Sequence, residues 1–95
     1  MTSLMTRGDL QPGALLHLTT QRLGIDGLGI ILGKYKRKSQ TAGYNILFKG
    51  EVITFCATST PTKLILSARG VNPQQPNIYY SFKPTLIAGS THDRQ

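Results

Sequence analysis

Residues 27–55 constrain the fold more than any other part of the chain, because they contain three strand patterns and both of the connections between them. Leu28 to Tyr35 is rich in β-favouring residues, and Tyr44 to Phe48 and Glu51 to Phe55 are shorter segments of the same kind. The Lys49-Gly50 dipeptide between the last two is typical of a two-residue hairpin turn. The segment therefore predicts a three-stranded antiparallel meander, which in so short a chain is normally the centre of a small barrel.

The tight turn also sets the register of the two strands that it joins. With a two-residue loop, Ile46 should face Ile53 across the ladder within about one residue. Alternation along the strands places Ile46 and Phe48 on the core face, and we assign Ile30 to the core face of the preceding strand, with Ile31 on the opposite face. Replacing any one of Ile30, Ile46 and Phe48 by alanine should lower the free energy of unfolding by about 2–5 kcal/mol.

Further segments complete a predicted barrel over residues 14–69. Ala14 to Thr20 alternates as a first strand, and Lys63 to Ser67 is a fifth short strand. Because Pro61 cannot donate a ladder hydrogen bond, we expect Ala57 to Thr62 to form a single tight helical turn between the fourth and fifth strands. The sequence thus predicts an all-β protein, a small barrel of about five strands with polar N- and C-terminal arms.

The two polar arms flank this barrel. Residues 1–13 are polar and end in a turn signal, which is typical of an arm leading into a first strand. Residues 70–95 begin with a Pro-rich linker that we expect to cross the surface. Ile78 to Phe82, which precedes Pro84, is either a sixth strand at the barrel edge or an extended arm that docks elsewhere.

The order of elements over residues 13–67 resembles the SH3-like small barrels, including the KOW and Tudor-like groups. In those families a turn like Pro12-Gly13 often precedes the first strand, and a glycine-flanked strand like Gly29-Ile30-Ile31-Leu32-Gly33 comes second. The chain departs from the peptide-binding SH3 domains because it has no tryptophan, and because the loop at residues 21–27 lacks the aromatic and acidic cluster that holds Pro-rich ligands. The resemblance therefore implies a fold rather than an activity.

A second resemblance covers Gly29 to Lys34 and Tyr44 to Glu51. These two segments look like parts of the short SH3-like proteins that tailed bacteriophages encode. The resemblance implies a component of a larger protein assembly, such as a phage particle.

The charge and the single cysteine limit the partners and the setting. Eleven Lys and Arg against four Asp and Glu give a net charge of +7, which favours anionic partners such as nucleic acid or an acidic protein surface. With Cys56 alone, no intramolecular disulfide can form, which suits a reducing compartment. The N-terminus lacks the apolar core of a signal peptide, and no apolar run is long enough to span a bilayer. We expect a soluble protein, intracellular where it is made.

The titratable residues form no catalytic or metal-binding pattern in the sequence. His17 and His92 are far apart, and no Cys, Asp or Glu lies at metal-ligand spacing from either. The acidic residues form no pair for acid–base chemistry, and no serine lies in a nucleophile elbow. We therefore expect no catalytic residue, no metal, no cofactor and no enzyme activity.

The densest positive charge lies at the end of the second predicted strand and the start of the loop after it. It consists of Lys34, Lys36, Arg37 and Lys38, with Tyr35 among them. Four cations and one ring suit a loop that grips phosphates and stacks a base, so this segment is the candidate nucleic-acid or polyanion site. The alternative is a solvated hairpin tip whose charge serves solubility.

Tyr79, Tyr80 and Phe82 form an aromatic cluster beyond the predicted barrel. Aromatic residues on an otherwise polar segment are typical anchors at protein interfaces, so this cluster is the candidate protein-interface site. The other interpretation is that the rings cap a barrel opening or extend its sheet.

The sequence favours a non-enzymatic structural or interaction protein, a small barrel built into a larger homo- or hetero-oligomeric assembly such as a virion. In this interpretation the barrel is rigid and the polar arms contact other protein chains. Two alternatives stay open. One is a nucleic-acid-binding barrel that uses residues 34–38, and the other is a small regulator that docks on a host protein. We expect no membrane partner.

Overall fold

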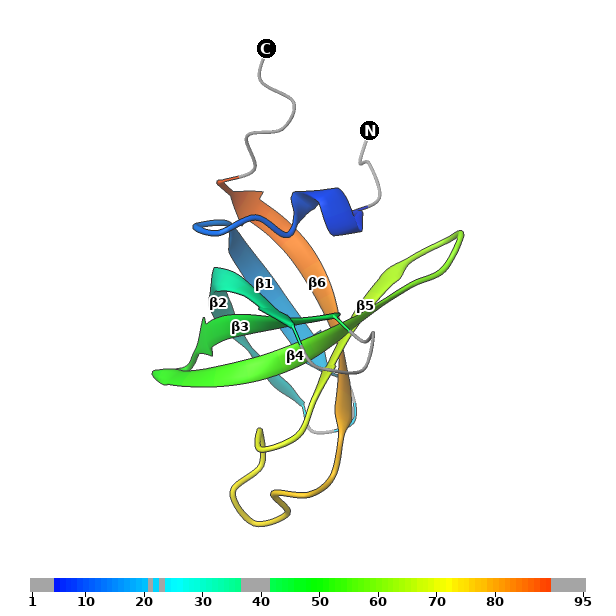
Figure 1. Cartoon of the computed structure of the whole chain (residues 1–95). Helices are drawn as coiled ribbons and strands as arrows, with labels where there is room; N and C mark the ends of the chain where they lie inside the picture. Colours follow the sequence, from blue (N-terminus) through cyan, green and yellow to red (C-terminus); the bar gives the residue numbers. More distant parts are fainter. Residues whose placement is uncertain (1–4, 21, 23, 37–41, 90–95) are drawn as a thin grey trace.

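The computed structural model describes residues 5–20, 22, 24–36 and 42–89, and these residues form a closed barrel of antiparallel strands (Figure 1). Each strand pairs with the next along the chain, and the last pairs with the first. The strands are β1 (Leu15–Thr20), β2 (Ile25–Lys36), β3 (Ala42–Phe48), β4 (Glu51–Ser59), β5 (Leu64–Ala68) and β6 (Tyr80–Ala88). The predicted all-β small barrel is confirmed, with six strands instead of about five, and it is consistent with an SH3-like barrel.

The β3–β4 hairpin has the predicted register. Ile46 faces Ile53, as a two-residue loop requires. Lys49 (φ 54°) and Gly50 (φ 84°) both lie in the left-handed region that such turns need. Because their backbone twist matches that of the strands, the turn holds the centre of the sheet in one register.

Three phenylalanine rings fill the middle of the barrel. Phe48 of β3, Phe55 of β4 and Phe82 of β6 contact one another edge to face, with ring centroids 5.6 to 6.2 Å apart. Alternation along each strand adds aliphatic side chains around them. The largest buried aliphatic residues from the strands are Leu16, Leu18, Ile31, Ile46 and Leu66, and Leu10, which precedes β1, adds another.

The inward face of β2 is the opposite of the predicted one. Ile31 is 1% exposed, whereas Ile30 is 40% exposed, so the assignment of Ile30 to the core is wrong. Gly29 is buried on the same side as Ile31, and a Cβ there would come within 2.8 Å of Ile46 Cγ2 and 3.1 Å of Leu18 Cδ1. The interior has no room for a side chain at this position, which determines the face of β2 that is buried.

Residues 57–62, all of them described, contain no helical turn. Instead β4 continues to Ser59 and pairs with β5. Pro61 lies in the turn beyond the strand, where no ladder hydrogen bond is needed. Thr60 closes this turn, because its N–H donates to the Lys63 carbonyl at 2.8 Å and its Oγ1 accepts from the Lys63 N–H at 3.1 Å. The prediction ended the fourth strand too early, because Pro61 lies in the turn and does not interrupt the hydrogen-bond ladder of β4.

The segment after residue 70 includes a wall of the barrel. β6 pairs with β5 through residues 80–82 and with β1 from Lys83 to Ala88. Pro84 lies in the part of β6 that pairs with β1 alone, so its missing N–H costs no bond to β5. The barrel therefore extends to Ala88, beyond the predicted limit of residue 69, and closure means that β6 is not an edge strand.

The described N-terminal residues pack on the barrel. A 3-10 turn, η1 (Arg7–Asp9), lies at the end of the barrel where β1 begins and β6 ends (Figure 1). Leu10 is 2% exposed in the core, and Arg7 Nη2 donates to the Ala57 carbonyl at 2.9 Å. Contacts within this chain therefore hold residues 5–13, which were predicted to be an arm held by other chains.

The outermost parts of the two predicted arms, residues 1–4 and 90–95, lie outside the described residues. Within the described ranges, no helix is long and apolar enough to cross a membrane.

Candidate interaction surfaces

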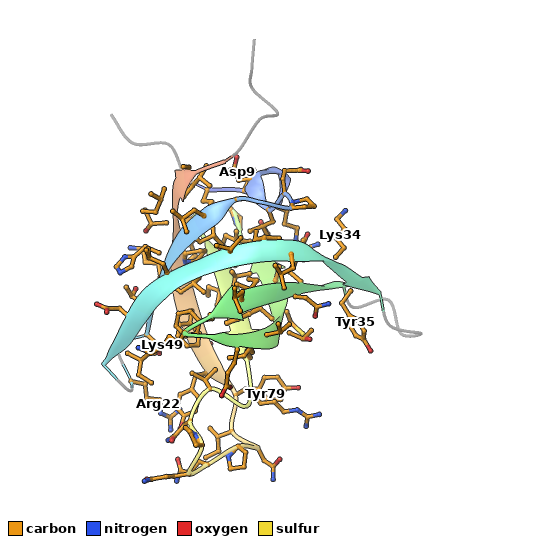
Figure 2. The ribbon with its side chains drawn as sticks, turned by 90° about the vertical axis from the view of Figure 1, so that its left-hand side faces the viewer. Asp9, Arg22, Lys34, Tyr35, Lys49 and Tyr79 are labelled. Carbon is orange, nitrogen blue, oxygen red and sulfur yellow. The ribbon has the colours of Figure 1, made fainter. Side chains whose placement is uncertain are left out.

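The predicted polyanion site lies at the end of β2. Lys34 and Tyr35 are exposed there, and Lys36 is the last residue of the strand. Figure 2 shows the Lys34 and Tyr35 side chains on opposite sides of the β2 ribbon, as expected for neighbours in a strand. Arg37 and Lys38 lie outside the described residues. The described part of this segment therefore does not direct its charge and its ring to one point.

Two of the three residues in the predicted aromatic anchor belong to the barrel's own core. Tyr80 is 4% exposed and Phe82 is 1% exposed, because alternation along β6 directs both inward. They extend the barrel wall, which is the alternative left open by the sequence, and they are not available as anchors for a neighbour. Tyr79 is 51% exposed, and the Arg69 guanidinium lies 5.8 Å from its ring centroid.

A row of apolar side chains crosses the outside of four neighbouring strands. Ile30 of β2 pairs with Leu15 of β1 on one side and with Leu47 of β3 on the other, and Leu47 pairs with Val52 of β4. Ile30, Leu47 and Val52 are 40%, 36% and 60% exposed, and Leu15 is half-buried. Since directly paired residues share a face of the sheet, these four form one strip, which we call the outer apolar row.

Two leucines widen the outer apolar row along β2. Leu28 and Leu32, which precede and follow Ile30 by two residues, are 55% and 49% exposed. A single exposed leucine is ordinary on a monomer, whereas a contiguous apolar patch is typical of an interaction site. Apolar residues on both faces of β2 are the sequence signal for this surface, although the prediction that Ile30 lies in the core was wrong.

A groove of about 410 Å³ lies where β5 and β6 meet the end of β1. Among the described residues, its lining includes the cations Arg22, Lys63 and Lys83 and no Asp or Glu. Tyr79 lines the groove as well, and Figure 2 shows Arg22 and Tyr79 at the same end of the barrel. Sequence reasoning missed this groove because its cations are far apart along the chain and form no local pattern.

A second hollow, of about 440 Å³, shares Tyr79 with the groove. Its lining also includes Tyr35, Cys56, Glu51 and Arg69. The carboxylate and the guanidinium have opposite charges, so this hollow favours neither an anion nor a cation.

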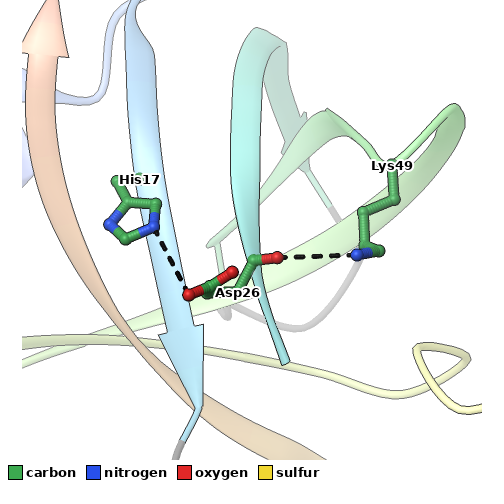
Figure 3. A network of polar contacts seen from close by, with 3 residues as sticks. All are labelled: His17, Asp26 and Lys49. Carbon is green, nitrogen blue, oxygen red and sulfur yellow. Dashed lines mark hydrogen bonds and ion pairs between the residues drawn. The ribbon is translucent and has the colours of Figure 1, made fainter. Parts of the chain in front are cut away.

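His17, Asp26 and Lys49 form a small polar network on the side of the barrel (Figure 3). His17 Nε2 lies 4.0 Å from Asp26 Oδ2, and the Lys49 ammonium donates to the Asp26 carbonyl at 3.5 Å. The His17 and Asp26 side chains are 39% and 69% exposed, so solvent screens their attraction. The network is a weak surface link between β1, β2 and the β3–β4 turn.

The described residues contain no group of three or more His, Cys, Asp or Glu that could hold a metal ion. Comparison with known proteins found no matching family model, no matching curated protein and no matching solved structure.

Proposed function

We propose that this protein is a non-enzymatic structural protein, a small rigid barrel built into a larger protein assembly, and that the outer apolar row contacts a neighbouring subunit. The observation that carries the proposal is the continuity of this row across four strands. Fully burying an exposed Leu, Ile or Val side chain contributes about 1.5–3 kcal/mol, so covering even partly exposed members of the row favours association. A surface of this kind suits a protein partner better than solvent.

The neighbouring subunit in this proposal is a second copy of the chain. The outer apolar row carries no charge, so two copies related by a twofold axis would bury apolar side chains against each other without burying a charge. Two twisted sheets pack face to face at about −30°, a geometry in which such rows interdigitate. The net charge of +7 opposes this association at low ionic strength, so salt should strengthen it.

A more specific form of this proposal is that the larger assembly is a phage particle. Its support is the resemblance of residues 29–34 and 44–51 to the small SH3-like proteins of tailed bacteriophages. A closed barrel with an outer apolar row suits a subunit of such a particle, because charged residues are depleted in the cores of protein interfaces.

Sedimentation velocity over a range of protein and salt concentrations tests the proposal. The wild-type chain should self-associate, and the double variant Ile30→Ser/Leu47→Ser should be monomeric while its circular dichroism stays that of a folded barrel. The matched control is Ile78→Ser/Ile87→Ser, which removes two other exposed apolar side chains that are 38% and 53% exposed. A wild-type chain that stays monomeric throughout, or equal loss of association in the control, contradicts the proposal.

A further inference from the structure

We infer that the groove between β5, β6 and the end of β1 binds single-stranded nucleic acid. Arg22, Lys63 and Lys83 line it, and the part of the lining that the structure describes has no acidic residue. They come from the β1–β2 connection, the β4–β5 turn and β6, so the fold gathers them although the sequence does not. A concave surface whose described charged residues are all cations is the feature with which proteins follow a phosphate backbone.

Thr20 provides an independent observation in favour of a ligand. It lines the groove, it is only 5% exposed, and its hydroxyl has no hydrogen-bond partner among the described residues. A buried hydroxyl without a partner costs free energy, and a phosphate oxygen in the groove would accept its proton. Thr19 and Ser81 add two further hydroxyl groups to the same lining.

Tyr79 favours a nucleic acid over an acidic peptide as the polyanion. Its ring is 51% exposed and lines the groove, and Arg69 adds a positive charge 5.8 Å from the ring centroid. Every unpaired base has a flat face that can stack on such a ring beside a basic groove. A duplex keeps its bases stacked inside, so the exposed ring favours a single strand.

The groove is separate from the outer apolar row, and its described lining does not include Lys34 or Tyr35. Both surfaces include part of β1, but the row crosses it at Leu15, at the start of the strand, whereas the groove is lined by Thr19 and Thr20 at its end. A barrel that contacts a neighbouring subunit through the row therefore leaves the groove accessible. Binding of nucleic acid in the groove is thus a property beyond the proposed assembly role, and it does not depend on the subunit contact.

Fluorescence anisotropy with a labelled oligodeoxythymidine, titrated at several salt concentrations, tests the inference. The groove variant Arg22→Gln/Lys63→Gln/Lys83→Gln and the matched loop variant Lys34→Gln/Lys36→Gln/Arg37→Gln each remove three positive charges. Three phosphate contacts in the groove predict that the slope of log K against log salt becomes shallower by about 2 in the groove variant. The loop variant should keep most of the wild-type slope.

A second experiment, at constant salt concentration, tests whether the Tyr79 ring stacks on a base. Tyr79→Leu should weaken binding of the oligonucleotide roughly 5- to 100-fold, whereas Tyr79→Phe should bind like the wild type, because stacking needs the ring and not the hydroxyl. Circular dichroism of each variant verifies the fold, and these side chains lie at the surface of the groove.

Four results would overturn the inference. The first is that the wild-type chain does not bind the oligonucleotide at about 50 mM salt. The second and third are that the groove and loop substitutions weaken oligonucleotide binding equally, or that only the loop substitutions weaken it. The fourth is that the wild-type chain binds duplex DNA or polyglutamate more tightly than the single strand.

Discussion

Gly29 of β2 lies against Ile46 of β3 in the barrel interior, so closely that a Cβ on the glycine would be 2.8 Å from Ile46 Cγ2. This contact determines both faces of β2. With Gly29 inward, Ile31 is buried two residues later and Ile30 is directed outward, where it pairs with Leu47. The outer apolar row is therefore a consequence of how the interior packs.

Replacing Gly29 by alanine should destabilise the barrel by about 1–3 kcal/mol, because the added methyl group must displace Ile46 or Leu18 in a packed core. The free energy of unfolding from urea titrations measures the effect. Gly33→Ala is the matched control, since a Cβ there meets no atom within 4 Å. Equal stability of the two variants would contradict the packing described for β2.

Ile31→Ala should cost about 2–5 kcal/mol, because it leaves a cavity in the core. Ile30→Ala changes only a side chain that is 40% exposed, so it should cost far less. Urea unfolding of both variants, under one set of conditions, compares the two faces of the same strand. If Ile30→Ala were the more damaging change, the inward and outward faces would have to be exchanged.

A chain that ends after Gly70 should fail to fold, because it lacks β6 and with it the pairing that closes the barrel and the Phe82 ring. A chain that ends after Gly89 keeps all six strands and should unfold cooperatively, like the full chain. Circular dichroism and thermal unfolding distinguish the two. A folded chain without β6 would show that the strand is an arm rather than a wall.

The sequence was sufficient for elements whose signals are local. The β3–β4 hairpin was predicted with its register because Lys49-Gly50 specifies a two-residue turn, and the turn determines which residues face each other. Phe48 and Ile46 could be assigned to the core because their strand alternates. The all-β class followed from the same short-range patterns, whereas closure through β6 did not.

Features that depend on closure of the barrel could not be read from local patterns. Pro61 and Pro84 were taken as limits of strands, but Pro61 lies in a turn, and Pro84 lies where β6 has pairs with β1 only. Ile30 and Ile31 have similar hydrophobicity, so only the narrow space at Gly29 decides between them. Lys63 and Lys83 lie close together because β6 pairs with β5, and Arg22 joins them because β6 also closes on β1.

Cysteine cross-linking measures contact between two copies at the outer apolar row. In a Cys56→Ala background, which removes the single native thiol, Ile30→Cys and Leu47→Cys are oxidised separately and as a mixture. A disulfide requires the two Cβ atoms to approach to about 3.5–4.5 Å, so only positions at the contact can react efficiently. Ser81→Cys on β6, the strand opposite β3, is the control.

We expect disulfide-linked dimers from the row variants and monomers from Ser81→Cys. Monomers from every row variant, or equal cross-linking at Ser81→Cys, would contradict a subunit contact through the outer apolar row.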